Sequence, residues 1–162
     1  QIDSEKQRGT LVRVLLPLQR LSPVQVRLHP VVSDDALARL RGSQVLLVED
    51  HPMNRQLLQA LMGKLGIQTI IAENGQQALE CLAKSPESFN AVLMDVQMPV
   101  MDGIQATQRI REDARFANLP VIAVTANAMS DERALCLQAG MQDYLSKPVN
   151  LQALHEVLLR WI

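Results

Sequence analysis

Apolar and polar residues follow two rhythms from Gln44 onward, and the two rhythms alternate five times. Short runs that are apolar throughout predict strands buried on both faces of a sheet. Between these runs apolar residues recur at helical spacing, as at Leu57, Leu61 and Leu65, which predicts amphipathic helices. The predicted strands are Val45–Val48, Ile67–Ala72, Ala91–Met94, Val121–Val124 and Asp143–Leu145, and the predicted helices cover residues 53–65, 75–84, 103–112, 129–138 and 150–161.

Strands that alternate with helices predict an α/β fold with a doubly wound parallel sheet and helices on both faces. Five strands within residues 44–162 favour the flavodoxin-like strand order 2-1-3-4-5. Pro52 near the start of the first helix and Gly66 after its end are typical helix boundaries.

The chain before Gln44 shows little repeating order. Residues 9–17 predict one strand that proline ends, residues 19–43 contain two prolines and no clear period, and Ser33 is a candidate N-cap for a short helix over 33–41. One strand and one short helix cannot bury a core alone. We therefore expect this part to be a remnant of another domain followed by a linker.

Composition removes several classes of function. A formal net charge of -1 and 2% aromatic residues argue against direct nucleic-acid binding. Cys81 and Cys136 match no metal spacing and predict reduced thiols in a cytoplasmic protein. The chain shows no apolar run that could span a bilayer and no signal peptide, so we expect no membrane contact by this piece.

Polar residues follow the predicted strands at their carboxyl ends. Glu49 and Asp50 follow the first strand, Asp95 the third, Thr125 the fourth, and Lys147 lies just past the fifth. Ligands of such sheets bind at this edge, where the strand order reverses. Each residue alone reads as a helix cap or a solvated loop residue, but their convergence on one edge indicates a site.

The residue types at this edge suit phosphoryl chemistry. Three carboxylates repel one another unless a cation joins them, and a cluster that offers only oxygen ligands suits Mg²⁺. Lys147 adds a second positive charge that suits phosphate. A carboxylate beside Mg²⁺ and a lysine can attack phosphorus and become an acyl phosphate.

Residues 44–162 resemble a response-regulator receiver domain over essentially their whole length. The motifs that carry the resemblance are Val48-Glu49-Asp50, Leu93-Met94-Asp95-Val96-Gln97-Met98-Pro99, Met101-Asp102-Gly103, Val124-Thr125-Ala126 and Lys147-Pro148. The resemblance implies that Asp95 accepts a phosphoryl group from phosphohistidine. It also implies a Mg²⁺ or Mn²⁺ ion held directly by Asp50 and Asp95, by Glu49 through water, and by the backbone carbonyl of Gln97.

The same resemblance assigns the remaining positions. Lys147 pairs with the phosphoryl group, through a cis peptide bond to Pro148 that aims its amine into the site. Thr125 moves its hydroxyl onto a phosphoryl oxygen, and Tyr144 turns inward with it as a switch. Gln97 and Asn127 border the path of the hydrolytic water, and Gly103 permits a turn or helix start beside the acidic loop.

Residues 1–18 resemble the last hairpin of a histidine-kinase ATP-binding domain, although the usual phenylalanines are absent and Arg13 is unusual there. This implies that the parent is a hybrid sensor histidine kinase, a protein-histidine phosphotransferase anchored in a bacterial inner membrane. The piece in hand lacks the ATP-binding motifs, so we expect it to catalyse only its own phosphorylation and dephosphorylation.

The expected partners are a histidine kinase dimerisation domain, a histidine phosphotransfer protein, or both, docking on Met53, Asn54 and Leu57 of the first helix. None of the histidines at 29, 51 and 155 has a phosphohistidine context, so we expect surface or capping positions for them.

The main alternative is a pseudo-receiver, a protein-binding module without phosphotransfer, although such modules usually lack one of the acids or the lysine. An aspartyl phosphatase would need a second acid where Gln97 stands. A flavodoxin-type cofactor binder would need a phosphate-binding first loop in place of the acidic one.

Overall fold

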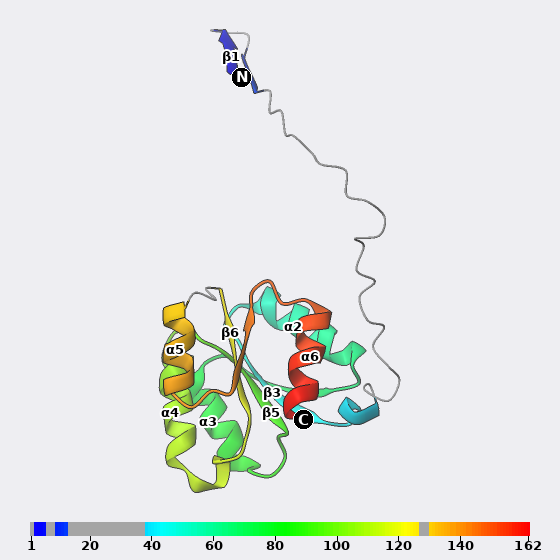
Figure 1. The fold of residues 1–162 in the computed structure, drawn as a ribbon, viewed down its shortest axis with the longest axis vertical. Helices are drawn as coiled ribbons and strands as arrows, with labels where there is room; N and C mark the ends of the chain where they lie inside the picture. Colours follow the sequence, from blue (N-terminus) through cyan, green and yellow to red (C-terminus); the bar gives the residue numbers. More distant parts are fainter. Residues whose placement is uncertain (1, 6–8, 13–37, 127–129) are drawn as a thin grey trace. The chain divides into compact units, whose positions relative to one another are not determined.

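The computed structural model describes residues 2–5, 9–12, 38–126 and 130–162 (Figure 1). The chain divides into two units, residues 1–31 and 32–162. In the first unit, β1 (Ile2–Glu5) pairs antiparallel with β2 (Gly9–Val12), and Ile2 lies opposite Val12. The apolar pattern had predicted only one strand here. It missed β1 because that strand contains aspartate, serine and glutamate, which give no apolar signal.

The second unit contains a five-stranded parallel sheet in the order β4-β3-β5-β6-β7, which confirms the predicted 2-1-3-4-5 topology. β3 pairs with β4 on one side and with β5 on the other, so it lies inside the sheet. The elements are β3 (Gln44–Val48), α2 (Pro52–Lys64), β4 (Gln68–Ala72), α3 (Gly75–Lys84), β5 (Ala91–Asp95), α4 (Gly103–Glu112), the short 3₁₀ helix η2 (Ala114–Phe116), β6 (Val121–Thr125), α5 (Ser130–Gln138), β7 (Asp143–Ser146) and α6 (Leu151–Trp161).

Alternate residues of the sheet belong to two cores, one on each face, and the helices divide accordingly (Figure 1). Val45 and Leu47 of β3 pack in the core that includes residues of α2 and α6. Leu46 and Val48 pack in the core that includes residues of α3, α4 and α5. Since β3, β5 and β6 are buried on both faces, their sequences are apolar except for one polar residue at an end of each strand.

Polar residues fix several helix starts. The side chains of Asn74, Asp102 and Asn150 each accept a hydrogen bond from the backbone N–H three residues on, at the starts of α3, α4 and α6. The loop before α4 is thereby held between the end of β5 and a capped first turn, whereas His51 at the start of α2 makes no side-chain cap hydrogen bond. Both cysteines are free, with Cys136 buried and Cys81 half-buried.

The packed unit begins before the predicted domain start at Gln44. Residues 38–40 are helical, and Leu40 is fully buried in the core with Val45 and Ile67. The backbone N–H of Gly42 also donates to the carbonyl of Gly66, at 3.0 Å. The rest of the predicted helix over 33–41 and most of the predicted linker lie outside the described residues.

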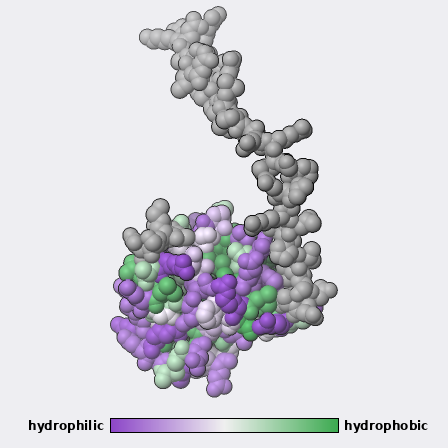
Figure 2. Space-filling model, in the orientation of Figure 1, coloured by the Kyte–Doolittle hydropathy of each residue, from purple (hydrophilic) through white to green (hydrophobic). Residues whose placement is uncertain are grey.

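On the face of the larger unit that Figure 2 shows, the described surface is mainly polar, with apolar residues in separate patches. Met53, Val100 and Leu135 are the most exposed large apolar residues described, at 72%, 82% and 55%. Within the described ranges, no helix has both the length and the hydropathy that a membrane span needs.

A half-buried guanidinium joins three segments at the amino ends of β6 and β7. Arg111 at the end of α4 donates to the carbonyl oxygens of Phe116, Leu119 and Gly140, at 2.6, 2.9 and 3.0 Å, and to Oε1 of Gln142 at 2.8 Å. Burial lowers the pKa of Arg111. Because all four partners are uncharged oxygens, this arginine acts as a multiple hydrogen-bond donor and not as half of an ion pair.

We predict that Arg111→Met lowers the free energy of unfolding by roughly 3 kcal/mol, because it leaves several part-buried carbonyl groups without a donor. Arg109→Met is the matched control, since Arg109 is exposed and its one ion pair with a described residue is a long one, 4.0 Å to Glu112. Urea unfolding of both variants measures the difference. Equal stabilities would mean that water replaces the guanidinium at no cost.

Candidate functional site

The five polar residues predicted from the strand ends do lie together. Glu49 and Asp50 follow β3, Asp95 ends β5, Thr125 ends β6, and Lys147 follows β7. One carboxylate oxygen from each of Glu49, Asp50 and Asp95 lies within 4.8 Å of the others. The parallel register brings this about, because it pairs Val48 with Met94 and Asp95 with Val124, so the three strands end at the same edge of the sheet.

Glu49 is held firmly although it is charged and almost fully buried. Its Oε1 accepts hydrogen bonds from the side-chain amide of Asn54, at 2.8 Å, and from the backbone N–H of His51, at 3.3 Å. Its Oε2 lies 2.7 Å from the amine of Lys147. Arg55 adds hydrogen bonds to the backbone carbonyls of Glu49 and Asp50, at 3.0 and 2.6 Å, which fix the acidic turn.

Asp95 shares the lysine with Glu49. Its Oδ2 accepts from the Lys147 amine at 2.7 Å, and its Oδ1 accepts from the backbone N–H of Gln97 at 3.2 Å. Burial raises the pKa of Asp95, the Lys147 hydrogen bond opposes that rise, and the charge of Glu49 adds to it. Although burial alone lowers the pKa of Lys147, its contacts with Asp95 and Glu49 outweigh burial and leave that pKa raised.

The donor set fits a hard divalent cation. The clustered atoms are all carboxylate oxygens, which Mg²⁺ prefers, and one ammonium does not neutralise three carboxylates. At Gln97 the structure shows the backbone N–H on Asp95, so the carbonyl of Gln97 as a metal ligand stays a prediction.

The backbone around Lys147 has the conformation expected from the sequence. The Lys147–Pro148 peptide bond is cis, as predicted. The backbone N–H of Lys147 donates to the carbonyl of Thr125 at 2.7 Å. The loop after β7 is therefore tied to the end of β6, and the lysine amine lies between two acids from two other strands.

The position of Gly103 depends on having no side chain. A Cβ built there would lie against the backbone carbonyl of Asp95, well inside van der Waals contact. The backbone N–H of Gly103 donates to the carbonyl of Val96 at 3.0 Å, and Thr107 donates to the carbonyl of Gly103 at 2.7 Å. The start of α4 thus packs directly on the backbone of the candidate acceptor.

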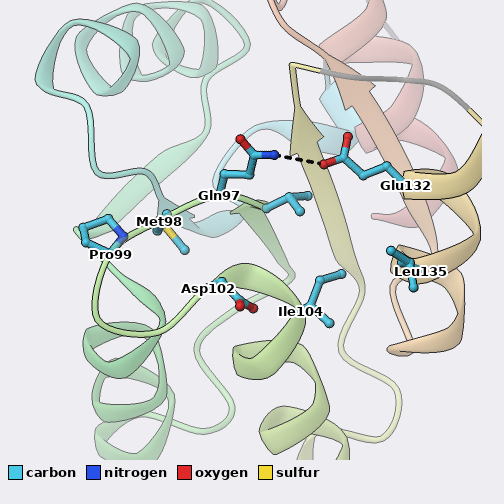
Figure 3. A pocket seen from close by; sticks show the side chains of 8 residues that line it. Gln97, Met98, Pro99, Asp102, Ile104, Glu132 and Leu135 are labelled. Carbon is cyan, nitrogen blue, oxygen red and sulfur yellow. Dashed lines mark hydrogen bonds between the residues drawn. The ribbon is translucent and has the colours of Figure 1, made fainter.

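The two predicted switch residues contact α5. The Thr125 hydroxyl donates to Oε2 of Glu132 at 2.5 Å, and the guanidinium of Arg133 lies 4.9 Å from the centre of the Tyr144 ring. The side-chain amide of Gln97 also meets Glu132, at 3.5 Å from Oε1 (Figure 3). The sequence alone gives no signal for Glu132 and Arg133, because charged residues on a helix carry none until the fold is known.

Three further predictions have different outcomes. His155 is wrong as a surface or capping residue, because it is 6% exposed in α6, whereas His51 is confirmed as the exposed N-cap residue of α2. Asn54 is only partly surface, since its amide turns inward to Glu49. His29 and Asn127 lie outside the described residues.

We predict that Lys147→Met lowers the free energy of unfolding at neutral pH by about 3 kcal/mol, because two buried carboxylates lose their cation. A raised pKa at Asp95 means that its ionisation weakens the metal-free fold, so the loss should shrink as the pH falls toward the ordinary pKa of a carboxyl group. Mg²⁺ should also restore stability.

Urea unfolding from pH 4 to pH 8, with and without Mg²⁺, measures both effects. Lys84→Met, at an exposed position late in α3, is the control for loss of one positive charge. A deficit in Lys147→Met that neither acid nor Mg²⁺ reduces would contradict the electrostatic cause.

Comparison with known proteins identifies the family. The model of the response regulator receiver domain matches residues 45–159. Sensor protein GacS of Pseudomonas syringae pv. syringae is 43% identical over 124 residues, covering 75% of this chain and 14% of GacS. Signal transduction histidine-protein kinase BarA of Escherichia coli strain K12 is 38% identical over 173 residues, covering 99% of this chain and 18% of BarA. The chain thus spans less than a fifth of these relatives.

Two solved structures share the fold. The receiver domain of a sensor histidine kinase from Pseudomonas aeruginosa PAO1, with a magnesium ion coordinated in its active site cleft, matches with a TM-score of 0.69 and 41% identity, covering 74% of this chain and 97% of that one. The receiver domain of Ssk1, in complex with the Saccharomyces cerevisiae phosphotransfer protein Ypd1, matches with a TM-score of 0.69 and 30% identity, covering 75% and 90%. The chain therefore belongs to the response regulator receiver domain family.

Proposed function

We propose that Asp95 accepts a phosphoryl group from phosphohistidine, with a divalent metal bound by the neighbouring acids. The observation that carries the proposal is the buried Asp95 carboxylate, which lies beside two further acids and 2.7 Å from a lysine amine. A purely structural role does not account for a third carboxylate beside the two that share Lys147, because that arrangement weakens the metal-free fold.

Each residue has a role in this proposal. Asp50 and Asp95 bind the metal directly, Glu49 binds it through water, and the carbonyl of Gln97 completes the protein ligands. The metal, Mg²⁺ or Mn²⁺, neutralises charge on the carboxylates and on the phosphoryl oxygens. Asn54 and the backbone of His51 orient Glu49 for that task.

The transfer is a substitution at phosphorus. One Asp95 oxygen attacks, the bond between phosphorus and the donor imidazole nitrogen breaks, and the imidazole leaves with that electron pair. Lys147 shifts from the free carboxylate to a phosphoryl oxygen. Thr125 brings its hydroxyl to a second phosphoryl oxygen, and Tyr144 turns inward as the readout of that movement.

The parent protein follows from the relatives. GacS and BarA are named as a sensor protein and a histidine-protein kinase, and the BarA match extends over residues 1–43 as well as the receiver. This supports residues 1–18 as the end of a kinase ATP-binding domain and residues 19–43 as mainly linker. The parent is then a hybrid sensor kinase anchored in a bacterial inner membrane, with this piece in the cytoplasm.

The phosphoryl donor or recipient docks beside the site on α2. Met53 and Leu57 lie one helical turn apart and are 72% and 45% exposed. Lys147, Pro148 and Leu57 line a small hollow next to them. The Ssk1 complex with Ypd1 supports a partner of this kind, either a histidine phosphotransfer protein or a kinase dimerisation domain.

Intact mass tests the chemistry. After incubation with Mg²⁺ and a small acyl phosphate, the wild-type chain should gain one phosphoryl group, and a chelator should abolish the gain. Asp95→Asn should gain none, because the amide is not a nucleophile of this kind. If neither the acyl phosphate nor a phosphohistidine donor labels the wild type, the chain is a pseudo-receiver and its acids serve binding or stability only.

Leucine substitutions test the docking face. Leu57→Arg should slow transfer from a phosphohistidine protein at least tenfold, because it places charge in an apolar contact, and should leave labelling by acyl phosphate unchanged. Leu137→Arg on α5 is the matched control, since Leu137 is 51% exposed on another face. Equal transfer rates in the two variants would move the docking site away from α2.

A further inference from the structure

Two consecutive residues of α5 hold the two predicted switch residues. Glu132 accepts the hydrogen bond from the Thr125 hydroxyl, and Arg133 lies over the ring of Tyr144. Both contacts come from the first half of α5. Thr125 is the last residue of β6, and Tyr144 lies in the neighbouring strand β7. A single short stretch of helix therefore contacts both groups whose movement the proposed function requires.

We propose that Glu132 is a positioning residue that holds the Thr125 hydroxyl away from Asp95 in the unphosphorylated domain. Phosphorylation of Asp95 is then disfavoured until the hydrogen bond between Glu132 and Thr125 breaks. This rests on the proposed function of Asp95. In this proposal the acidic cluster carries out the chemistry, and Glu132 sets the equilibrium between the unphosphorylated and phosphorylated conformations.

The geometry supports a firm hold. The two carboxylate oxygens of Glu132 meet different partners: Oε2 accepts from Thr125 at 2.5 Å and Oε1 from the Gln97 amide at 3.5 Å (Figure 3). Glu132 thereby spans the gap between the end of β6 and the loop after β5. A short hydrogen bond to a charged acceptor is among the stronger bonds in proteins, so the Thr125 contact dominates.

The hold is specific to the unphosphorylated state for two reasons. A threonine hydroxyl has one hydrogen to donate, so it cannot serve Glu132 and a phosphoryl oxygen at the same time. A phosphoryl group on Asp95 would also add negative charge on the side of Gln97 opposite Glu132, because the backbone N–H of Gln97 contacts Asp95 and its side-chain amide contacts Glu132. Both effects penalise phosphorylation while Glu132 stays in place.

Release of Glu132 would also change the surface nearby. Glu132 and Leu135 form one wall of an open groove, and Gln97, Met98, Pro99, Asp102 and Ile104 line the rest (Figure 3). When Glu132 loses its bond to Thr125, one of the side chains that line this groove becomes free to move. The contact of Arg133 with Tyr144 would then be free to break with it.

Linkage gives a sharp test. Beryllofluoride, which mimics an aspartyl phosphoryl group, should bind Glu132→Ala roughly tenfold more tightly than wild type at fixed Mg²⁺, because the variant has no competing hydrogen bond to break. Glu132→Gln keeps an acceptor without the charge and should fall between the two. Glu80→Ala, an exposed glutamate on α3, is the control and should bind within twofold of wild type. Calorimetric titration measures all four proteins.

A double-mutant cycle identifies the partner. The Thr125→Val variant has no hydroxyl to donate. In that background Glu132→Ala should therefore raise the affinity for beryllofluoride by a factor at least threefold smaller than it does when Thr125 is present. Unfolding of the ligand-free chain gives a second cycle, in which Thr125→Val and Glu132→Ala should be coupled because their bond exists in that state.

The outcomes separate this inference from the proposed function. If wild type binds beryllofluoride but Glu132→Ala binds no better, or gains equally with and without the Thr125 hydroxyl, the inference is overturned. If wild type neither binds nor becomes phosphorylated, the proposed function fails. The unfolding cycle then still decides whether Glu132 holds Thr125, and absence of coupling there rejects it.

Discussion

Lys147 supplies one positive charge where Glu49 and Asp95 supply two buried negative ones. This excess of negative charge determines what the edge of the sheet can bind. The amine lies 2.7 Å from both acids, which belong to the ends of β3 and β5. With Asp50 close by, the cluster keeps excess negative charge in a partly desolvated place. This excess charge lowers the stability of the metal-free fold, so it does not serve stability alone. Binding of a divalent cation there would offset the repulsion and stabilise the domain.

The opposite end of the sheet shows the contrasting solution. There Arg111 donates hydrogen bonds to four uncharged oxygens from two segments, residues 116–119 and 140–142. The two ends therefore divide the work, with a neutral hydrogen-bonded network that secures the fold and a charged one that remains ready for a ligand. Such a division is expected in open α/β sheets, whose ligands bind at the carboxyl ends of the strands.

The sequence predicted what depends on short-range pattern. β3 and β6 each contain four consecutive apolar residues because both of their faces are buried, so their positions were predicted to within a residue at either end. The topology then placed Asp95 and Lys147 at one edge. The side-chain partners could not be predicted, because they depend on residues far apart in the chain. Asn54 looked like an exposed helix residue until Glu49 was placed beside it, and Glu132 had no signal at all before β6 was placed next to α5. The apolar pattern missed the polar strand β1 for a different reason, since pairing with β2 does not require an apolar pattern, whereas the resemblance of residues 1–18 to a hairpin did imply a second strand.

The close approach of Gly103 to the carbonyl of Asp95 has a consequence for how this domain tolerates change. The backbone of Asp95, the proposed acceptor, occupies space that is free only because Gly103 has no side chain. A methyl group added there would shift the nucleophile while every reactive side chain stayed chemically intact. Loss of function in such a variant would look like a defect of reactivity, although its origin would be steric and would lie on the neighbouring helix.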